Sequence, residues 1–153
     1  MAIVSESMPF KPNMSKIAAM LNIGRNNIAD YILYMEESGM IAQLRSETNG
    51  VRALGKVDKI YLENTNLVQQ LGNKNQNVGK VRETFSLNQT PVHHQVNTSA
   101  MADFSINDSD FEVGGKNKGL KQIQNAPKGF VVKDDIEQGY LHVIPLWQFG
   151  LMY

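Results

Sequence analysis

The chain has 153 residues and no cysteine, and its 15 basic side chains equal its 15 acidic ones. That length suits one domain or two small ones, and a content of 42% hydrophobic and 20% charged residues is typical of a globular protein rather than a disordered one. The absence of cysteine excludes disulfides, thiolate catalysis and cysteine-ligated zinc. No apolar run approaches the roughly 20 residues that cross a bilayer, so we expect a cytoplasmic protein with no membrane partner.

After an N-terminal arm over residues 1–10, a first unit is expected to span residues 11–71. Apolar side chains recur at helical spacing from Ile17 to Leu21, and again from Arg25 to Glu37. Gly24 interrupts the two runs, and Gly39 lies where a helix C-cap is expected. Two short helices joined by a turn that contains glycine are typical of a helix-turn-helix.

A β-hairpin is predicted next. Residues 40–44 and 59–62 alternate apolar and polar side chains, as half-buried strands do. Asn49-Gly50 lies between them, and this dipeptide is the strongest short hairpin signal. The helices and the hairpin together predict a winged helix, followed by a short helix that runs through Leu71.

A linker over residues 72–79, rich in glycine and asparagine, is expected to lead into a second domain over residues 80–153. The spacing there predicts a helix over 81–89 and strands over 92–96, 102–106 and 110–113, the last two joined by a turn at 107–109. A helix over 119–124, a buried strand over 129–132, a strand at 143–144 and a helix that starts at Pro145 follow. The predicted fold class is therefore α+β, with an N-terminal winged helix and a small α/β domain built on a mixed sheet.

Five segments resemble, in this order, the C-terminal part of a family of bacterial AAA-type ATP-binding proteins: Pro9–Asn13, Lys59–Leu62, Arg82–Gln89, Phe111–Lys118 and Ile144–Gly150. The resemblance extends from about Met8 to Tyr153. In that family an ATPase domain precedes a winged helix, and the C-terminal domain is related to the PD-(D/E)xK restriction-endonuclease-like fold. The resemblance thus implies an endonuclease-like fold for residues 80–153.

The ATPase activity of the family does not carry over to this chain. No G-x-x-x-x-G-K-[ST] motif occurs in the sequence. Gly114-Gly115-Lys116 lacks the first glycine and is not followed by serine or threonine. We therefore expect no ATP cofactor, and the chain corresponds to the family's C-terminal part without its ATPase domain.

The sharpest candidate for chemistry is Asp103, Glu112 and a nearby lysine. In PD-(D/E)xK nucleases two carboxylates on neighbouring strands hold Mg²⁺ and a lysine helps position the attacking water. The two carboxylates lie on the two arms of the predicted hairpin, and Glu83 on the preceding helix would add a third metal ligand. The usual lysine position, two residues after Glu112, is Gly114, so Lys116 is the candidate lysine.

A second candidate site is a DNA-binding surface on the winged helix. Arg25, Asn26 and Asn27 begin the second helix, where recognition helices contact base edges and phosphates. Arg45 and Arg52 flank the hairpin and would contact phosphates. Acidic side chains on the same helix oppose this interpretation, because they weaken the attraction to nucleic acid.

These observations favour a non-catalytic module that recognises nucleic acid or a protein partner. One alternative is a Mg²⁺-dependent nuclease that uses Asp103, Glu112 and Lys116, and another is an inert remnant of a truncated gene.

Overall fold

In the computed structural model, residues 9–45, 57–71, 77–90 and 94–152 are described. The first unit consists of α2 (Met14–Leu21), α3 (Arg25–Glu37), β1 (Ile41–Leu44), β2 (Lys59–Leu62) and α4 (Thr65–Leu71). The two strands pair antiparallel, with Ala42 opposite Tyr61. The predicted turn at Asn49-Gly50 lies outside the described residues.

Local side-chain chemistry sets the ends of these elements. The side chain of Asn13 accepts a hydrogen bond of 3.0 Å from the backbone N–H of Lys16 and so caps α2. Asn22 ends that helix in the left-handed region at φ 53°. Gly39 adopts φ 67°, a conformation that favours glycine, and thereby turns the chain from α3 into β1.

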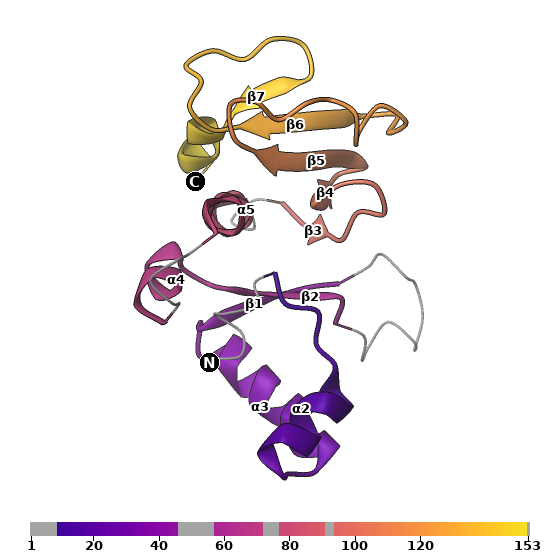
Figure 1. Cartoon of the computed structure of the whole chain (residues 1–153), viewed down its shortest axis with the longest axis vertical. Helices are drawn as coiled ribbons and strands as arrows, with labels where there is room; N and C mark the ends of the chain where they lie inside the picture. Colours follow the sequence, from indigo (N-terminus) through magenta and orange to yellow (C-terminus); the bar gives the residue numbers. More distant parts are fainter. Residues whose placement is uncertain (1–8, 46–56, 72–76, 91–93, 153) are drawn as a thin grey trace.

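The hairpin is shared by two hydrophobic clusters, one on each face. Ile41, Ile60 and Leu62 pack with the buried side chains of α2, α3 and α4. On the other face, Leu44 and Tyr61 belong to the cluster of the second unit. Figure 1 accordingly shows the hairpin crossing the middle of the molecule, with α2 and α3 on one side and α5 and the larger sheet on the other.

The second unit is a five-stranded mixed sheet with helices packed against it. Its elements are α5 (Val78–Gln89), β3 (Val96–Asn97), β4 (Phe104–Ile106), β5 (Ser109–Gly114), β6 (Gly129–Lys133), β7 (Val143–Pro145) and the 3₁₀ helix η2 (Leu146–Leu151). The strands lie in sequence order, with β3, β4 and β5 antiparallel and β5, β6 and β7 parallel. Figure 1 shows α5 and η2 at the same face of this sheet. The α+β class is confirmed.

A two-residue turn fixes the register of the β4–β5 hairpin. Asn107 and Asp108 have φ angles of 47° and 63°, as a type I′ turn requires at both central positions. Phe104 consequently lies opposite Phe111. Their rings stack with centroids 5.6 Å apart, and the ring of Phe149 in η2 meets that of Phe104 edge-on at 6.5 Å.

Several elements differ from the sequence prediction. Among the described residues, the strand predicted over 92–96 is Val96–Asn97, and the strand predicted over 102–106 begins at Phe104. The helix predicted over 119–124 is wrong, because the segment forms turns. The N–H of Ile123 donates to the carbonyl of Leu120, and the N–H of Ala126 donates to the carbonyl of Ile123. Pro127 disfavours a helical conformation at the residue before it, so the turns do not extend into a helix. Helix α5 begins at Val78, inside the predicted linker, because the Asn77 side chain accepts a hydrogen bond of 2.9 Å from the N–H of Gly79. Among the described helices, none combines the length and apolar character that crossing a membrane requires.

Candidate functional site

The β4–β5 hairpin brings Asp103 and Glu112 together. Asp103 directly precedes β4, and its N–H donates to the carbonyl of Phe111 at 3.0 Å. Its carboxylate Oδ2 accepts a hydrogen bond of 2.8 Å from the N–H of Val113. These two bonds place Asp103 beside Glu112 on the neighbouring strand.

Glu83 joins these carboxylates from α5 and is held by two side chains of the first unit. The hydroxyl of Tyr61 donates to its Oε1 at 2.5 Å, and Nζ of Lys59 lies 3.3 Å from the same oxygen. Lys59 also donates to the carbonyl of Asp103 at 2.8 Å. Sequence reasoning missed Lys59 and Tyr61, although their spacing of two residues places both on one face of β2.

Lys118, rather than the predicted Lys116, is the lysine of this site. Its ammonium forms an ion pair with the carboxylate of Glu112, which is 3% exposed. Lys116 lies exposed in the turn after β5. A Cβ added at Gly114 would lie 2.7 Å from three side-chain carbons of Lys118. The stem of Lys118 therefore fills the space that a lysine two residues after Glu112 would occupy.

We call these six residues the carboxylate–lysine cluster: Lys59, Tyr61, Glu83, Asp103, Glu112 and Lys118. Burial raises the pKa of Glu83, and the charge of Asp103 raises it further, against the lowering effect of Tyr61 and Lys59. Burial likewise raises the pKa of Glu112, and the hydrogen bond from Lys118 opposes this effect. Three carboxylates and two lysines thus lie together in a largely buried site.

A metal ion bound at this cluster would have to displace protein donors. Carboxylate oxygens are suitable Mg²⁺ ligands, but here each carboxylate is already engaged by a protein donor. Within the described ranges no group of three or more Asp, Glu or His side chains is arranged to hold a metal. Through Lys59 and Tyr61 the cluster also forms a polar connection between β2 and the second unit.

The residues predicted to bind DNA that the structure describes lie on α3 and directly after β1. Arg25, Asn26 and Asn27 are exposed on the first turn of α3. Arg45 lies 3.5 Å from a carboxylate oxygen of Glu36, and Arg52 is outside the described residues. Over residues 11–71 the sequence has seven basic side chains and six acidic ones: Lys11, Lys16, Arg25, Arg45, Arg52, Lys56 and Lys59 against Asp30, Glu36, Glu37, Glu47, Asp58 and Glu63.

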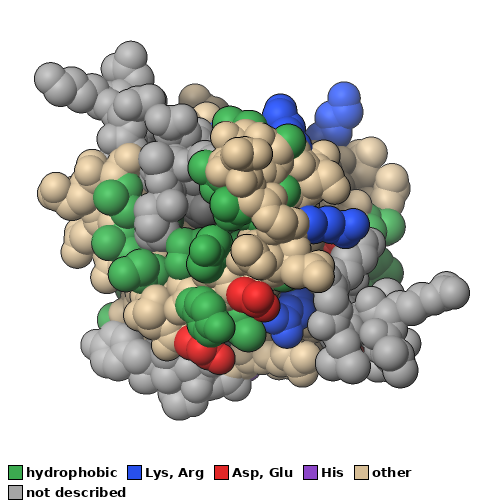
Figure 2. Space-filling view, turned by 90° about the horizontal axis from the view of Figure 1, so that it is seen from below, with side chains coloured by type: hydrophobic (Ala, Val, Ile, Leu, Met, Phe, Trp, Pro, Cys, Tyr) green, Lys and Arg blue, Asp and Glu red, His purple; other side chains and the backbone are tan. Residues whose placement is uncertain are grey.

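The helical end of the molecule exposes large apolar side chains instead. Only Ile28 and Ile32 of the 13 residues of α3 are buried. Four large apolar side chains of α2 and α3 are more than half exposed, and we call them the α2–α3 face: Met20, Leu21, Tyr31 and Tyr34. Figure 2 views the molecule from this end and shows hydrophobic side chains spread over it, with Lys and Arg toward one side.

The described residues therefore offer two sites of different character. The carboxylate–lysine cluster is buried and its polar groups are paired, whereas the α2–α3 face is apolar and exposed. No protein-family model, curated protein or solved structure matches the chain.

Proposed function

We propose that the chain is a recognition module without catalytic activity, which binds a protein partner through the α2–α3 face. The observation that carries this proposal is the exposure of Tyr31 (52%) and Tyr34 (60%) on α3, together with that of Met20 and Leu21 at the end of α2. Tyrosine and methionine are enriched at protein interfaces. Contiguous apolar patches on a soluble protein mark interaction surfaces more often than isolated apolar residues do.

The order of elements supports the architecture that the resemblance implies. Two helices followed by an antiparallel hairpin favour a winged helix for the first unit. A helix followed by a mixed sheet favours an endonuclease-like fold for the second. In the family that the sequence resembles, an AAA-type ATPase domain precedes this region, and such a domain is the partner that we propose.

Charge favours a protein over nucleic acid as the partner. Affinity for DNA depends on cationic side chains that neutralise phosphates. Residues 11–71 have seven basic and six acidic side chains, so the excess of positive charge is only one, and Arg45 is next to Glu36. The exposed cations of α2 and α3 are only Lys16 and Arg25 among the described residues of these helices.

Binding can be tested by calorimetric titration of the chain with the purified ATPase domain of a family member. We expect the double variant Tyr31→Ser/Tyr34→Ser to lose at least tenfold in affinity, because it removes two aromatic anchors. Tyr140→Ser is the matched control, since Tyr140 is 76% exposed in the second unit. Equal affinities of the two variants, or no binding by the parent chain, would contradict the proposal. Binding of a labelled DNA duplex that weakens steeply with salt and with Arg25→Ala would instead make nucleic acid the partner.

One observation favours a second candidate, a Mg²⁺-dependent nuclease. Gly114 stands at the position two residues after Glu112 where such nucleases have a lysine, and Lys118 places an ammonium beside Glu112 in its stead. This function predicts cleavage of plasmid DNA or single-stranded RNA that requires Mg²⁺ or Mn²⁺, is abolished in Glu112→Gln and is retained in Lys116→Met. Absence of metal-dependent cleavage by the parent chain would exclude it.

A further inference from the structure

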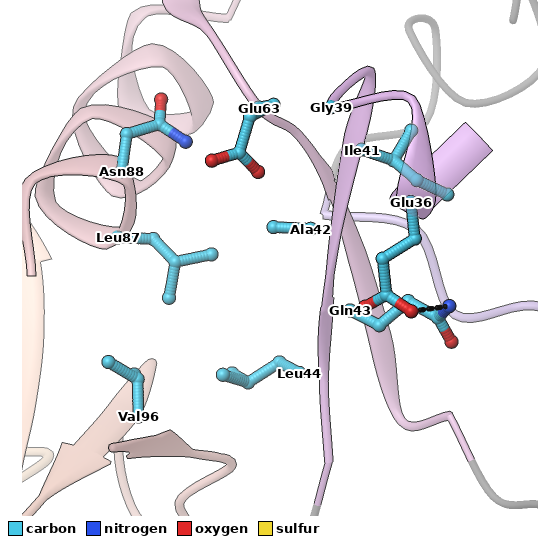
Figure 3. Close-up of a pocket in the computed structure, with 10 residues that line it drawn as sticks. All are labelled: Glu36, Gly39, Ile41, Ala42, Gln43, Leu44, Glu63, Leu87, Asn88 and Val96. Carbon is cyan, nitrogen blue, oxygen red and sulfur yellow. Dashed lines mark hydrogen bonds between the residues drawn. The ribbon is translucent and has the colours of Figure 1, made fainter. Parts of the chain in front are cut away.

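A pocket of about 330 Å³ lies between the hairpin and the second unit. Its apolar wall is formed by Ala42 and Leu44 of β1, Leu87 of α5 and Val96 of β3. Figure 3 shows these four side chains directed toward one another across the open space. The volume is near the lower end of the roughly 300–1,000 Å³ that is typical of ligand sites, which is enough for a few side chains rather than a large ligand.

The backbone of β1 also lines this pocket. The N–H of Glu63 donates to the carbonyl of Met40 at 3.0 Å, and Ala42 is paired with Tyr61. Because backbone groups alternate in an antiparallel pair, those of Ile41 and Gln43 are directed away from β2. The side chain of Ile41 lies in the first hydrophobic cluster, and that of Gln43 donates to Glu36 at 2.7 Å, on the side of β1 opposite Ala42 and Leu44.

This edge of β1 already bonds to the second unit at one end. The N–H of Thr98, just after β3, donates to the carbonyl of Arg45 at 3.1 Å. Farther along, β1 and β3 are separated by the pocket. Among the described residues none bonds to the outward backbone groups of Ile41 and Gln43. A strand edge of this kind is a template for an additional strand.

Negative charge marks the rim of the pocket. Glu36 and Glu63 both line it, and Figure 3 shows the carboxylate of Glu63 between Asn88 and Ala42. Partial burial raises the pKa of Glu63, and the charge of Glu36 raises it further. Glu36 has Arg45 as its ion-pair partner, but no cation of the described chain lies within ion-pair distance of Glu63.

We propose that this pocket binds an extended segment of another protein that contains lysine or arginine, as an additional strand along β1. Its backbone hydrogen-bonds to Ile41 and Gln43. Side chains alternate along a strand, so residues two apart in the bound segment lie on the same face. One apolar side chain of the segment packs against the apolar wall of the pocket, and the lysine or arginine two residues away reaches Glu63. This binding mode does not depend on the α2–α3 face, so either proposal can fail without the other.

Fluorescence polarisation with synthetic peptides tests the proposal. The probe is the fluorescein-labelled peptide Thr-Val-Thr-Lys-Thr-Val, and its matched control has glutamate in place of lysine. We expect saturable binding of the lysine peptide, at least tenfold tighter than that of the glutamate peptide. We also expect Glu63→Lys to reverse this preference, and Glu37→Lys, a charge change on the exposed surface of α3, to leave it unchanged.

Two further measurements distinguish strand addition from a loose charge contact. Binding should slow amide exchange at Ile41 or Gln43 in two-dimensional NMR, and a peptide with proline in place of the central threonine should bind at least tenfold more weakly. Absence of saturable binding at millimolar peptide, equal affinity for the two peptides, or an unchanged preference in Glu63→Lys would overturn the proposal.

Discussion

Replacing Lys118 by methionine tests the carboxylate–lysine cluster most directly. The side chain of Glu112 is only 4% exposed, so the variant leaves a buried carboxylate without its ammonium partner. Breaking a buried ion pair on one side costs about 3–5 kcal/mol. Since 28% of the Lys118 side chain is exposed, we expect a loss near the lower limit, about 3 kcal/mol at pH 7. This corresponds to a decrease in Tm of about 6–12 °C for a chain of this size.

Lys116→Met is the matched control for this experiment. Lys116 is the neighbouring lysine and lies exposed in the turn after β5, so its replacement should change the free energy of unfolding by at most about 0.5 kcal/mol. Urea denaturation followed by circular dichroism measures both variants. Equal stability of Lys118→Met and Lys116→Met would refute the assignment of Lys118 to the cluster.

A positional exchange separates the charge of the lysine from its place in the chain. A side chain at residue 114 would occupy the space of the Lys118 stem, at 2.7 Å from its carbons. Gly114→Lys alone should therefore destabilise the chain, because two stems compete for one space. Gly114→Lys combined with Lys118→Ala should be more stable than Lys118→Ala alone, since the new lysine lies on the same face of β5 as Glu112. No recovery in the double variant would show that the ammonium cannot reach Glu112 from the regular strand position.

Three further predictions concern stability measured by urea denaturation. Tyr61→Phe removes the hydroxyl that donates to buried Glu83 and should lower the free energy of unfolding by about 2 kcal/mol. Tyr31→Phe on the exposed surface should change it by at most about 0.5 kcal/mol. Equal effects of the two variants would contradict the hydrogen bond. The raised pKa of Glu83 means that the folded state retains this proton better than the unfolded state, so stability should fall as pH rises above the ordinary glutamate pKa of about 4.3. That slope should flatten in Glu83→Gln, and an identical slope would count against the buried charge. Asp108→Gly relieves the left-handed conformation at φ 63° and should stabilise the hairpin by about 0.5 kcal/mol, whereas Asp108→Val should destabilise it by about 1–2 kcal/mol; the opposite order would contradict the type I′ turn.

Apolar spacing and short apolar runs predicted several elements. The helix over 25–37 and the strands over 59–62 and 129–132 have clear spacing, and the structure has elements at these positions. The predicted helix over 119–124 is wrong because local apolar spacing does not reveal that the turns end at Pro127. Apolar spacing predicts a start of α5 that is too late in the sequence. The capping by Asn77 depends on a side-chain orientation, which spacing alone does not give.

The candidate site was only partly predictable for a geometric reason. Asp103 and Glu112 belong to one local hairpin, so their proximity follows from strand pairing over a short sequence distance. Lys118 reaches Glu112 from beyond the end of β5, because Gly114 leaves room for its stem. A rule of fixed spacing along a strand indicates Lys116 and cannot detect a side chain that returns from a turn.

The contacts of Lys59 and Tyr61 required the tertiary structure, and they bear on how the two units are joined. Tyr61 is fully buried and packs, with Leu44, in the hydrophobic cluster of the second unit. Its hydroxyl and the Lys59 ammonium bind Glu83 from the same face of β2. A first unit separated from residues 77–153 would expose this tyrosine and leave Lys59 without its partner. The hairpin is therefore a structural part of both units, and it fixes the position of the β1 edge, with its acidic pocket, relative to α5.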